Sequence, residues 1–121
     1  MRRALVIGLA ETGISVTRRL LAEDCDVVVV EDRPRGDAYK ARAQHARTLG
    51  AEVVEAPVAA DVAALAASVD LVVPSPLVNA RHPAVVAARE RGIPVRSEID
   101  LAAERTRMPI IAVTGTNGKT T

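Results

Sequence analysis

Short apolar runs alternate with longer segments rich in alanine and arginine along most of the chain. The apolar runs contain many β-branched residues and are bounded by glycine or polar turns, which is typical of buried strands. We expect strands at residues 4–7, 26–31, 52–55, 71–73, 95–96 and 110–113. Between them we expect helices at residues 12–23, 37–49, 61–67, 83–91 and 99–105. This alternation predicts an α/β fold, a Rossmann-like three-layer sandwich with a mostly parallel sheet.

The composition supports a core without aromatic side chains. Of the 121 residues, 49% are hydrophobic, yet there is one tyrosine and no phenylalanine or tryptophan. Valine, isoleucine, leucine and alanine must therefore fill the core, which suits a parallel sheet covered on both faces. The net charge of +1 gives no reason to expect a nucleic-acid or anionic-membrane partner. We expect no membrane span and no signal peptide, and a cytoplasmic protein.

Few side chains suggest metal or thiol chemistry. Cys25 is the only cysteine, so an internal disulfide is excluded, and we expect a packed thiol. His45 and His82 lack a metal-ligand pattern and are interpreted as surface or helix-end residues. The arginines between residues 35 and 47 are expected on a solvated helix face, with phosphate binding as the alternative. Glu98 and Asp100 are expected to have a capping or hinge role, with substrate contact as the alternative.

The first turn, VIGLAETGIS, places Gly8 and Gly13 at the ends of a G-x-G-x-x-G spacing, with Ala10 in the middle position. In a dinucleotide-binding fold this turn and the helix after it bind a pyrophosphate. Glu31, at the end of the second expected strand, stands where such folds have a ribose-binding carboxylate. An NAD(P)-binding module is therefore one alternative. Another is that the two glycines only permit close packing of helix and strand.

The chain closes on VTGTNGKTT, which contains the Gly-Lys-Thr core of a phosphate-binding loop. The standard spacing would place a glycine at Val113, whereas this loop has Gly115. The closing segment resembles the ATP loop of the Mur ligases, which also occurs in closely similar form in folylpolyglutamate synthetase. The segments IGLAETGIS, EDRP, Ser75-Pro76 and IPVRSEIDLA also resemble this family, in particular its ligases that add D-glutamate to UDP-N-acetylmuramoyl-L-alanine.

The resemblance implies a binding site for the UDP part of the substrate. The matching positions are Leu9, Ala10, Glu11, Thr12, Glu31, Asp32, Arg33, Ser75 and Pro76. Glu31, Asp32 and Arg33 stand for an Asp-Thr-Arg turn that holds uracil in the family. Leu77 stands where the family usually has the glycine of a Ser-Pro-Gly loop. These departures leave room for another Mur ligase as a further alternative.

The resemblance also implies an ATP site in the closing loop. Its matching positions are Thr116, Asn117, Gly118, Lys119, Thr120 and Thr121. Lys119 would be the catalytic residue that pairs with phosphate oxygens, and the Thr120 hydroxyl would ligate Mg²⁺. Residues 1–107 would form the UDP-binding domain, and residues 108–121 would begin a central ATP-binding domain.

The full enzyme that this resemblance implies would use ATP and Mg²⁺ to activate the substrate carboxylate as an acyl phosphate, which the amine of D-glutamate then attacks. The present chain would be its N-terminal part, which binds UDP and is inactive alone. We expect it to be a monomer.

Overall fold

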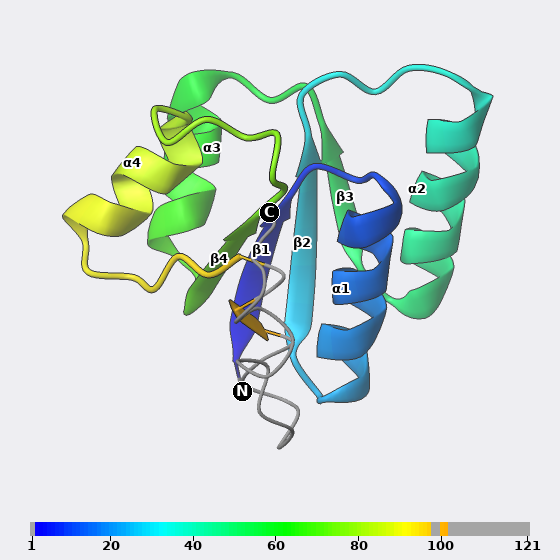
Figure 1. Ribbon diagram of the computed structural model, residues 1–121, viewed down its shortest axis with the longest axis horizontal. Helices are drawn as coiled ribbons and strands as arrows, with labels where there is room; N and C mark the ends of the chain where they lie inside the picture. The colour runs from blue at the N-terminus through cyan, green and yellow to red at the C-terminus, as the bar shows by residue number, and fades with distance from the viewer. Residues whose placement is uncertain (1, 98–99, 102–121) are drawn as a thin grey trace, which may run out of the picture.

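The computed structural model of the protein describes residues 2–97, 100 and 101, and in this part strands alternate with helices (Figure 1). In chain order the elements are β1 (Arg3–Ile7), α1 (Glu11–Ala22), β2 (Asp26–Glu31), α2 (Asp37–Leu49), β3 (Glu52–Glu55), α3 (Ala59–Ala67), β4 (Leu71–Pro74) and α4 (Pro83–Glu90). The predicted α/β fold with a parallel sheet is confirmed.

Within the described residues the sheet has the strand order β3-β2-β1-β4, and every pair is parallel. The register places Val6 of β1 between Val29 of β2 and Val73 of β4. The chain runs outward from β1 to β3 and then returns to place β4 on the other side of β1. In open parallel sheets such a reversal positions ligands at the carboxyl ends of the strands.

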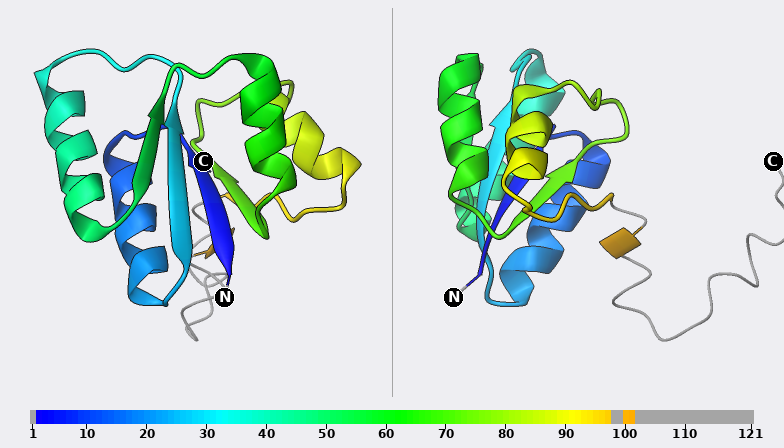
Figure 2. Two further views of the ribbon diagram at one scale, coloured as in Figure 1. Left: turned by 180° about the vertical axis from the view of Figure 1, so that it is seen from behind. Right: turned by 90° about the vertical axis from the view of Figure 1, so that its left-hand side faces the viewer.

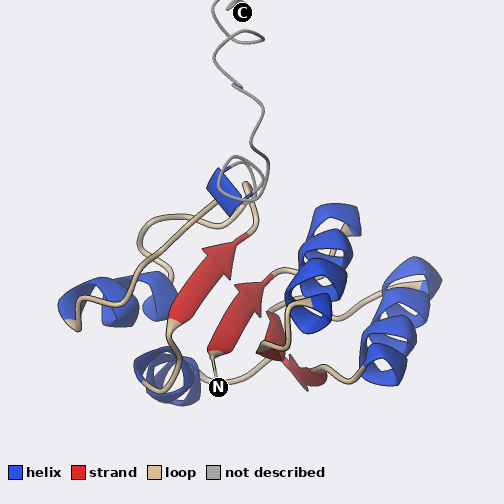
Figure 3. Ribbon diagram, turned by 90° about the horizontal axis from the view of Figure 1, so that it is seen from below, coloured by secondary structure: helices blue, strands red, loops and turns tan. Residues whose placement is uncertain are grey.

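Helices cover both faces of this sheet. Alternate strand residues such as Val6 and Val29 pack under α1 and α2, with Leu20 and Tyr39. Their neighbours, for example Ile7, pack on the other face under α3 and α4. Figure 2 shows the two helix pairs from behind and from the side, and Figure 3 shows the strands between them. The result is three layers with two valine-rich cores.

The predicted element bounds agree with the structure to within two residues. The ranges predicted for β2, α2 and β3 are those observed. Elsewhere β1 starts one residue earlier, α1 is shifted by one residue, α3 starts two earlier, β4 ends one later and α4 ends one earlier. The helix α2 ends cleanly because Gly50 adopts φ +111°, a left-handed conformation that favours glycine.

The prediction of a strand at residues 95–96 is wrong. In the structure this segment forms only an isolated parallel bridge, between Val72 and Val95. After it, Ser97 and Asp100 form a reciprocal cap: the Ser97 amide donates to Asp100 Oδ2 at 3.1 Å, and the Asp100 amide donates to Ser97 Oγ at 3.0 Å. The capping role expected for Asp100 is confirmed. Glu98, most of the predicted helix 99–105 and the strand 110–113 lie outside the described residues.

No helix in the part of the chain that the structure describes is long and apolar enough to cross a membrane.

Candidate functional site

The turns that follow β1, β2 and β4 meet at the carboxyl edge of the sheet. The Gly8 amide donates to the Val30 carbonyl at 2.8 Å, and the Ser75 amide donates to the Ile7 carbonyl at 2.8 Å. These bonds continue the parallel ladder one step past the strands, so all three turns leave the sheet at the same level (Figure 1). The glycine turn after β1, the turn at Glu31–Arg33 and the Ser75-Pro76 loop therefore converge at one edge of the sheet.

Both glycines of the first turn are required by close packing. Gly8 has φ +96°, and a Cβ there would lie 2.9 Å from Cβ of Ser75. A Cβ on Gly13 would lie 2.1 Å from the Gly8 carbonyl oxygen, so the first turn of α1 rests directly on the end of β1. The packing alternative thus accounts for both glycines, and their spacing alone does not identify a ligand.

Glu31 connects the first turn to the second. Its Oε1 accepts the Leu9 amide at 2.9 Å, and its Oε2 accepts the Arg33 amide at 3.0 Å. The carboxylate therefore fixes two turns at once, using both oxygens on backbone N–H groups. A ribose-binding carboxylate would need the same oxygens for hydroxyl groups. The position of Glu31 matches the dinucleotide fingerprint, but its hydrogen bonds give it an organising role in this protein.

A second link runs from α2 to the same turn. The Arg42 guanidinium donates from Nε to the Leu9 carbonyl oxygen at 2.8 Å, and the arginine is half-buried. The expectation of a purely solvated arginine face on α2 is therefore wrong at this position. Leu9 itself is buried, with 1% of its surface exposed, so the turn has its side chain in the core and its backbone at the edge.

The helix α1 begins at this edge without a side-chain cap. Ala10 occupies the N-cap position, and its side chain has no oxygen that could accept from the first amides of the helix. Glu11 and Thr12 follow, and both are exposed. The Ser15 hydroxyl donates to the Glu11 carbonyl at 3.1 Å. Amides in the first turn of a helix suit anions, and here the acidic Glu11 side chain lies in the same turn.

The loop after β4 is held in a tight turn. The Val78 amide donates to the Ser75 carbonyl at 2.9 Å, and the Leu77 amide lies 3.3 Å from Ser75 Oγ. Leu77, at the tip, is 93% exposed. Pro76 therefore lies in a tight turn at the carboxyl edge.

His82 was missed as a site residue by the sequence interpretation, which placed it at a surface or a helix end. It is the N-cap of α4, where its Nδ1 accepts the Ala84 amide at 3.1 Å. Its Nε2 lies 2.8 Å from Oδ2 of Asp32, fifty residues earlier in the chain. The position before Pro83 at a helix start signals a cap. No local pattern signals the contact with Asp32.

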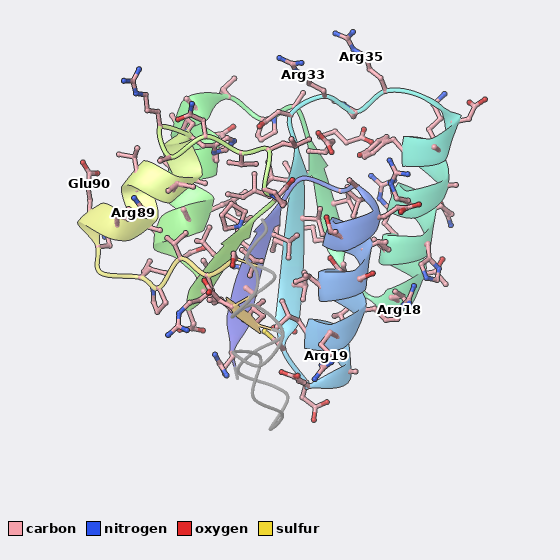
Figure 4. All side chains as sticks on the ribbon, in the orientation of Figure 1. Arg18, Arg19, Arg33, Arg35, Arg89 and Glu90 are labelled. Carbon is pink, nitrogen blue, oxygen red and sulfur yellow. The ribbon has the colours of Figure 1, made fainter. Side chains whose placement is uncertain are left out.

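Arg33 and Arg35 extend from the turn after β2. Both are exposed, and Figure 4 shows both side chains pointing away from the body of the molecule at the carboxyl edge. The guanidinium of Arg33 is thus available to a ligand lying over this edge.

Two titratable side chains, Cys25 and Tyr39, lie in the core under α1 and α2. Burial raises the pKa of the Cys25 thiol, in agreement with the packed role expected for it. Burial also raises the pKa of Tyr39, and the hydrogen bond that its hydroxyl donates to Glu55 Oε2 at 2.7 Å adds to this shift. Cys25 precedes β2, at the opposite end of the sheet, whereas the Tyr39 hydroxyl is engaged by Glu55 at the carboxyl end of β3.

The described part of the chain has no cluster of three or more histidine, cysteine or acidic side chains suited to a metal ion. The predicted ATP and Mg²⁺ positions, residues 116–121, lie outside the described residues. The structure therefore brings together every predicted UDP-site segment, adds His82 and Arg42 to them, and does not address the closing loop.

Comparison with known proteins gives a consistent relationship. A family model described as Mur ligase MurD-like, N-terminal domain, matches residues 2–97. A UDP-N-acetylmuramoylalanine–D-glutamate ligase from Desulfatibacillum aliphaticivorans is 41% identical over 120 residues, covering 99% of this chain and 26% of that protein. The ligase of the same name from Syntrophus aciditrophicus is 40% identical, with the same coverage of both chains. The chain thus spans about a quarter of the length of these curated relatives.

Among solved structures, the UDP-N-acetylmuramate-alanine ligase MurC from Thermotoga maritima has a TM-score of 0.68. It shares 22% sequence identity, and the match covers 86% of this chain and 22% of that one. At this identity the likeness supports the fold alone.

Proposed function

Since the chain belongs to the Mur ligase family and matches its MurD-like N-terminal domain, we propose that it binds the UDP part of UDP-N-acetylmuramoyl-L-alanine for a D-glutamate-adding ligase. The names of the relatives support the choice of substrate. The observation that carries the proposal is the convergence of three turns at one edge, tied together by the Leu9–Glu31 and Asp32–His82 contacts. The strand order reverses at β1, and open parallel sheets generally bind ligands at the carboxyl ends of the strands beside such a reversal.

Each turn has a separate proposed role. The amides of residues 10–12 would receive the diphosphate at the start of α1, where backbone N–H groups and the helix dipole favour negative charge. Glu31 would keep this turn in place, and Asp32 and Arg33 would contact the uracil. Ser75 and Pro76 would form the opposite side of the site. This nucleotide handle would provide binding energy far from the reacting carboxylate, which it helps to position.

The ATP part of the proposal rests on the sequence of residues 116–121. The residue types fit a nucleoside triphosphate with its metal ion, because the Lys119 ammonium can pair with phosphate oxygens and the Thr120 hydroxyl can reach Mg²⁺. ATP would supply the phosphoryl group that makes the substrate carboxylate reactive toward the D-glutamate amine. We place the boundary between the UDP-binding and ATP-binding domains at residues 107–108.

The 121-residue chain is proposed to bind UDP without catalysing ligation, because it corresponds to about a quarter of the relatives' length. We expect a cytoplasmic monomer. A different Mur ligase is the alternative, since the family match concerns the N-terminal domain.

The proposal is tested by isothermal titration calorimetry of the chain with UDP, UDP-N-acetylmuramoyl-L-alanine and NADH. Both uridine ligands should bind, and NADH should not. Arg33→Ala should weaken both uridine ligands by about tenfold or more, the usual loss for a charge-assisted hydrogen bond. Arg35→Ala is the matched control, since it removes another exposed arginine two residues away and should leave binding unchanged.

Binding of NADH without binding of UDP would overturn the proposal in favour of a dinucleotide module. Equal losses in Arg33→Ala and Arg35→Ala would show a diffuse charge effect and remove Arg33 from the site. Formation of ADP and amide product by the purified chain would contradict the proposed lack of activity.

A further inference from the structure

The contact between His82 and Asp32 joins two turns that the sheet keeps apart. Asp32 follows β2 and His82 begins α4 after β4, whereas β2 and β4 are separated by β1. Strands two places apart in a sheet lie about 10 Å from each other, so the two turns must reach over the end of β1 to meet. Their side chains do so with a distance of 2.8 Å between Nε2 and Oδ2.

The orientation of the His82 ring is fixed by its other nitrogen. Because Nδ1 accepts the Ala84 amide as the cap of α4, the proton of the neutral ring lies on Nε2. Nε2 therefore donates to the Asp32 carboxylate. The histidine side chain is 12% exposed and the aspartate side chain 47%, so an enclosed ring holds a carboxylate that remains open to a ligand.

The geometry points to a specific use of this open carboxylate. With Oδ2 engaged by His82, the other oxygen, Oδ1, is the one that a ligand can approach. An ionised carboxylate only accepts hydrogen bonds. Uracil presents a donor at N3–H, whereas cytosine presents an acceptor at the same ring position. A fixed Asp32 would therefore favour uracil over cytosine.

We propose that His82 is a positioning residue for uridine recognition, holding Asp32 so that Oδ1 accepts the N3–H of the base. This inference rests on the proposed UDP site and deepens it by assigning the selection of the base to one pair of side chains. Asp32 touches the ligand, and His82 acts through it.

A single substitution can separate the two roles of His82, which caps α4 and holds Asp32 in position. In His82→Asn the shorter side chain can still cap α4, because asparagine is among the best N-cap residues. It is too short to reach Asp32 as the imidazole does. His45→Asn is the matched control, because His45 is the only other histidine and is exposed on α2.

The experiment measures the affinities of UDP and CDP by calorimetry, with the melting temperature of each variant. The unaltered chain should prefer UDP. In His82→Asn the affinity for UDP should fall about tenfold, the usual cost of one well-placed hydrogen bond to a charged group, while CDP binding stays the same. The melting temperature should stay close to that of the unaltered chain, and His45→Asn should change nothing.

Asp32→Asn gives a second and opposite readout. His82 would still donate to the amide oxygen, so the amide NH₂ group would face the base as a donor. The preference should then shift from UDP toward CDP. In the double variant with His82→Asn the amide is free to turn, and this shift should disappear.

The outcomes separate the two proposals. If the unaltered chain fails to bind UDP, the proposed function fails and this inference with it. If UDP binds but His82→Asn leaves the UDP/CDP ratio unchanged, or weakens both nucleotides equally, this inference alone is overturned. Should His82→Asn fail to fold, Asp32→Asn decides, because an unchanged preference for UDP in that variant excludes the assigned role.

Discussion

At the scale of single residues, the two glutamates of the site differ in what they do for an incoming phosphate. Glu31 is partly buried, and its charge is compensated by the amides of Leu9 and Arg33. Glu11 is exposed in the first turn of α1, at the end of the helix where amides would meet a diphosphate. An acidic side chain there stabilises the helix through a favourable interaction with its dipole, yet it repels an anion that binds to the same amides.

Glu11→Gln should therefore tighten UDP binding while slightly destabilising the free protein. We expect the affinity to rise about two- to fivefold and the free energy of unfolding to fall by about 0.3–1 kcal/mol, the range for one charge at a helix end. Calorimetry and urea unfolding measure the two effects. Glu90→Gln is the control with the same change of net charge, because Glu90 ends α4 on the opposite side of the molecule (Figure 4).

An increase in affinity of the same size in Glu90→Gln would show that net charge, and not the position of Glu11, limits binding. The difference between the variants should also shrink with added salt, because exposed charges are screened.

At the scale of elements, the site depends on how closely α1 approaches β1. Helix propensity alone favours alanine over glycine by about 1 kcal/mol in a helix. At Gly13 that preference is opposed by the Gly8 carbonyl oxygen, which would lie 2.1 Å from the new Cβ. The obstacle is backbone and cannot rotate aside, so α1 would have to move away from the strand.

Gly13→Ala should thus destabilise the protein, with a net loss of about 1–3 kcal/mol in the free energy of unfolding, the usual cost of overpacking. Urea denaturation measures it. Ser15→Ala, on the exposed face of the same helix, is the control and should change stability little. An equally stable Gly13→Ala protein would mean that the helix shifts at no cost, and the close approach would not explain this glycine.

The sequence predicts elements well where local signals are strong. The end of α2 is marked by Gly50, and β2 by an uninterrupted run of valines after Asp26. The start of α3 at Ala59 carries no capping side chain, which is why its predicted start is two residues late. The turns of the site were predictable because parallel strands place their carboxyl ends at one edge.

The contacts within the site were less predictable. The pairing of His82 with Asp32 and of Arg42 with Leu9 joins residues 50 and 33 positions apart. Such contacts depend on the exact placement of one helix against another turn, and neither residue type nor spacing encodes it. Sequence therefore predicted the segments that meet at the carboxyl edge, but not the contacts of His82 and Arg42 that hold them together.

At the scale of the whole molecule, the stability of the fold in alkali should depend on two buried acids. Cys25 and Tyr39 are the only thiol and the only phenol in the chain, and both lie in the core under α1 and α2. Folding raises both pKa values, chiefly by burial, above ordinary values of 9.0 and 10.0. Folding therefore favours the protonated form of each group.

The sign of the pH dependence follows from proton binding. Well below pH 9 both groups are protonated in the folded and unfolded states, and they do not change the free energy of unfolding with pH. Above the ordinary pKa of each group the unfolded chain releases a proton that the folded chain retains. The free energy of unfolding should then fall by up to about 1.4 kcal/mol per pH unit for each group, until the folded protein titrates too.

Urea unfolding at several pH values between 8 and 11 would measure this decline. Cys25→Ala should remove the part that begins near pH 9, and Tyr39→Phe the part that begins near pH 10. Tyr39→Phe should also lower stability by about 1 kcal/mol at neutral pH, because Glu55 loses its hydrogen-bond donor. The double variant should be nearly flat across this range. An equally steep decline in the double variant would locate the alkaline sensitivity elsewhere, because no other thiol or phenol exists in the chain to produce it.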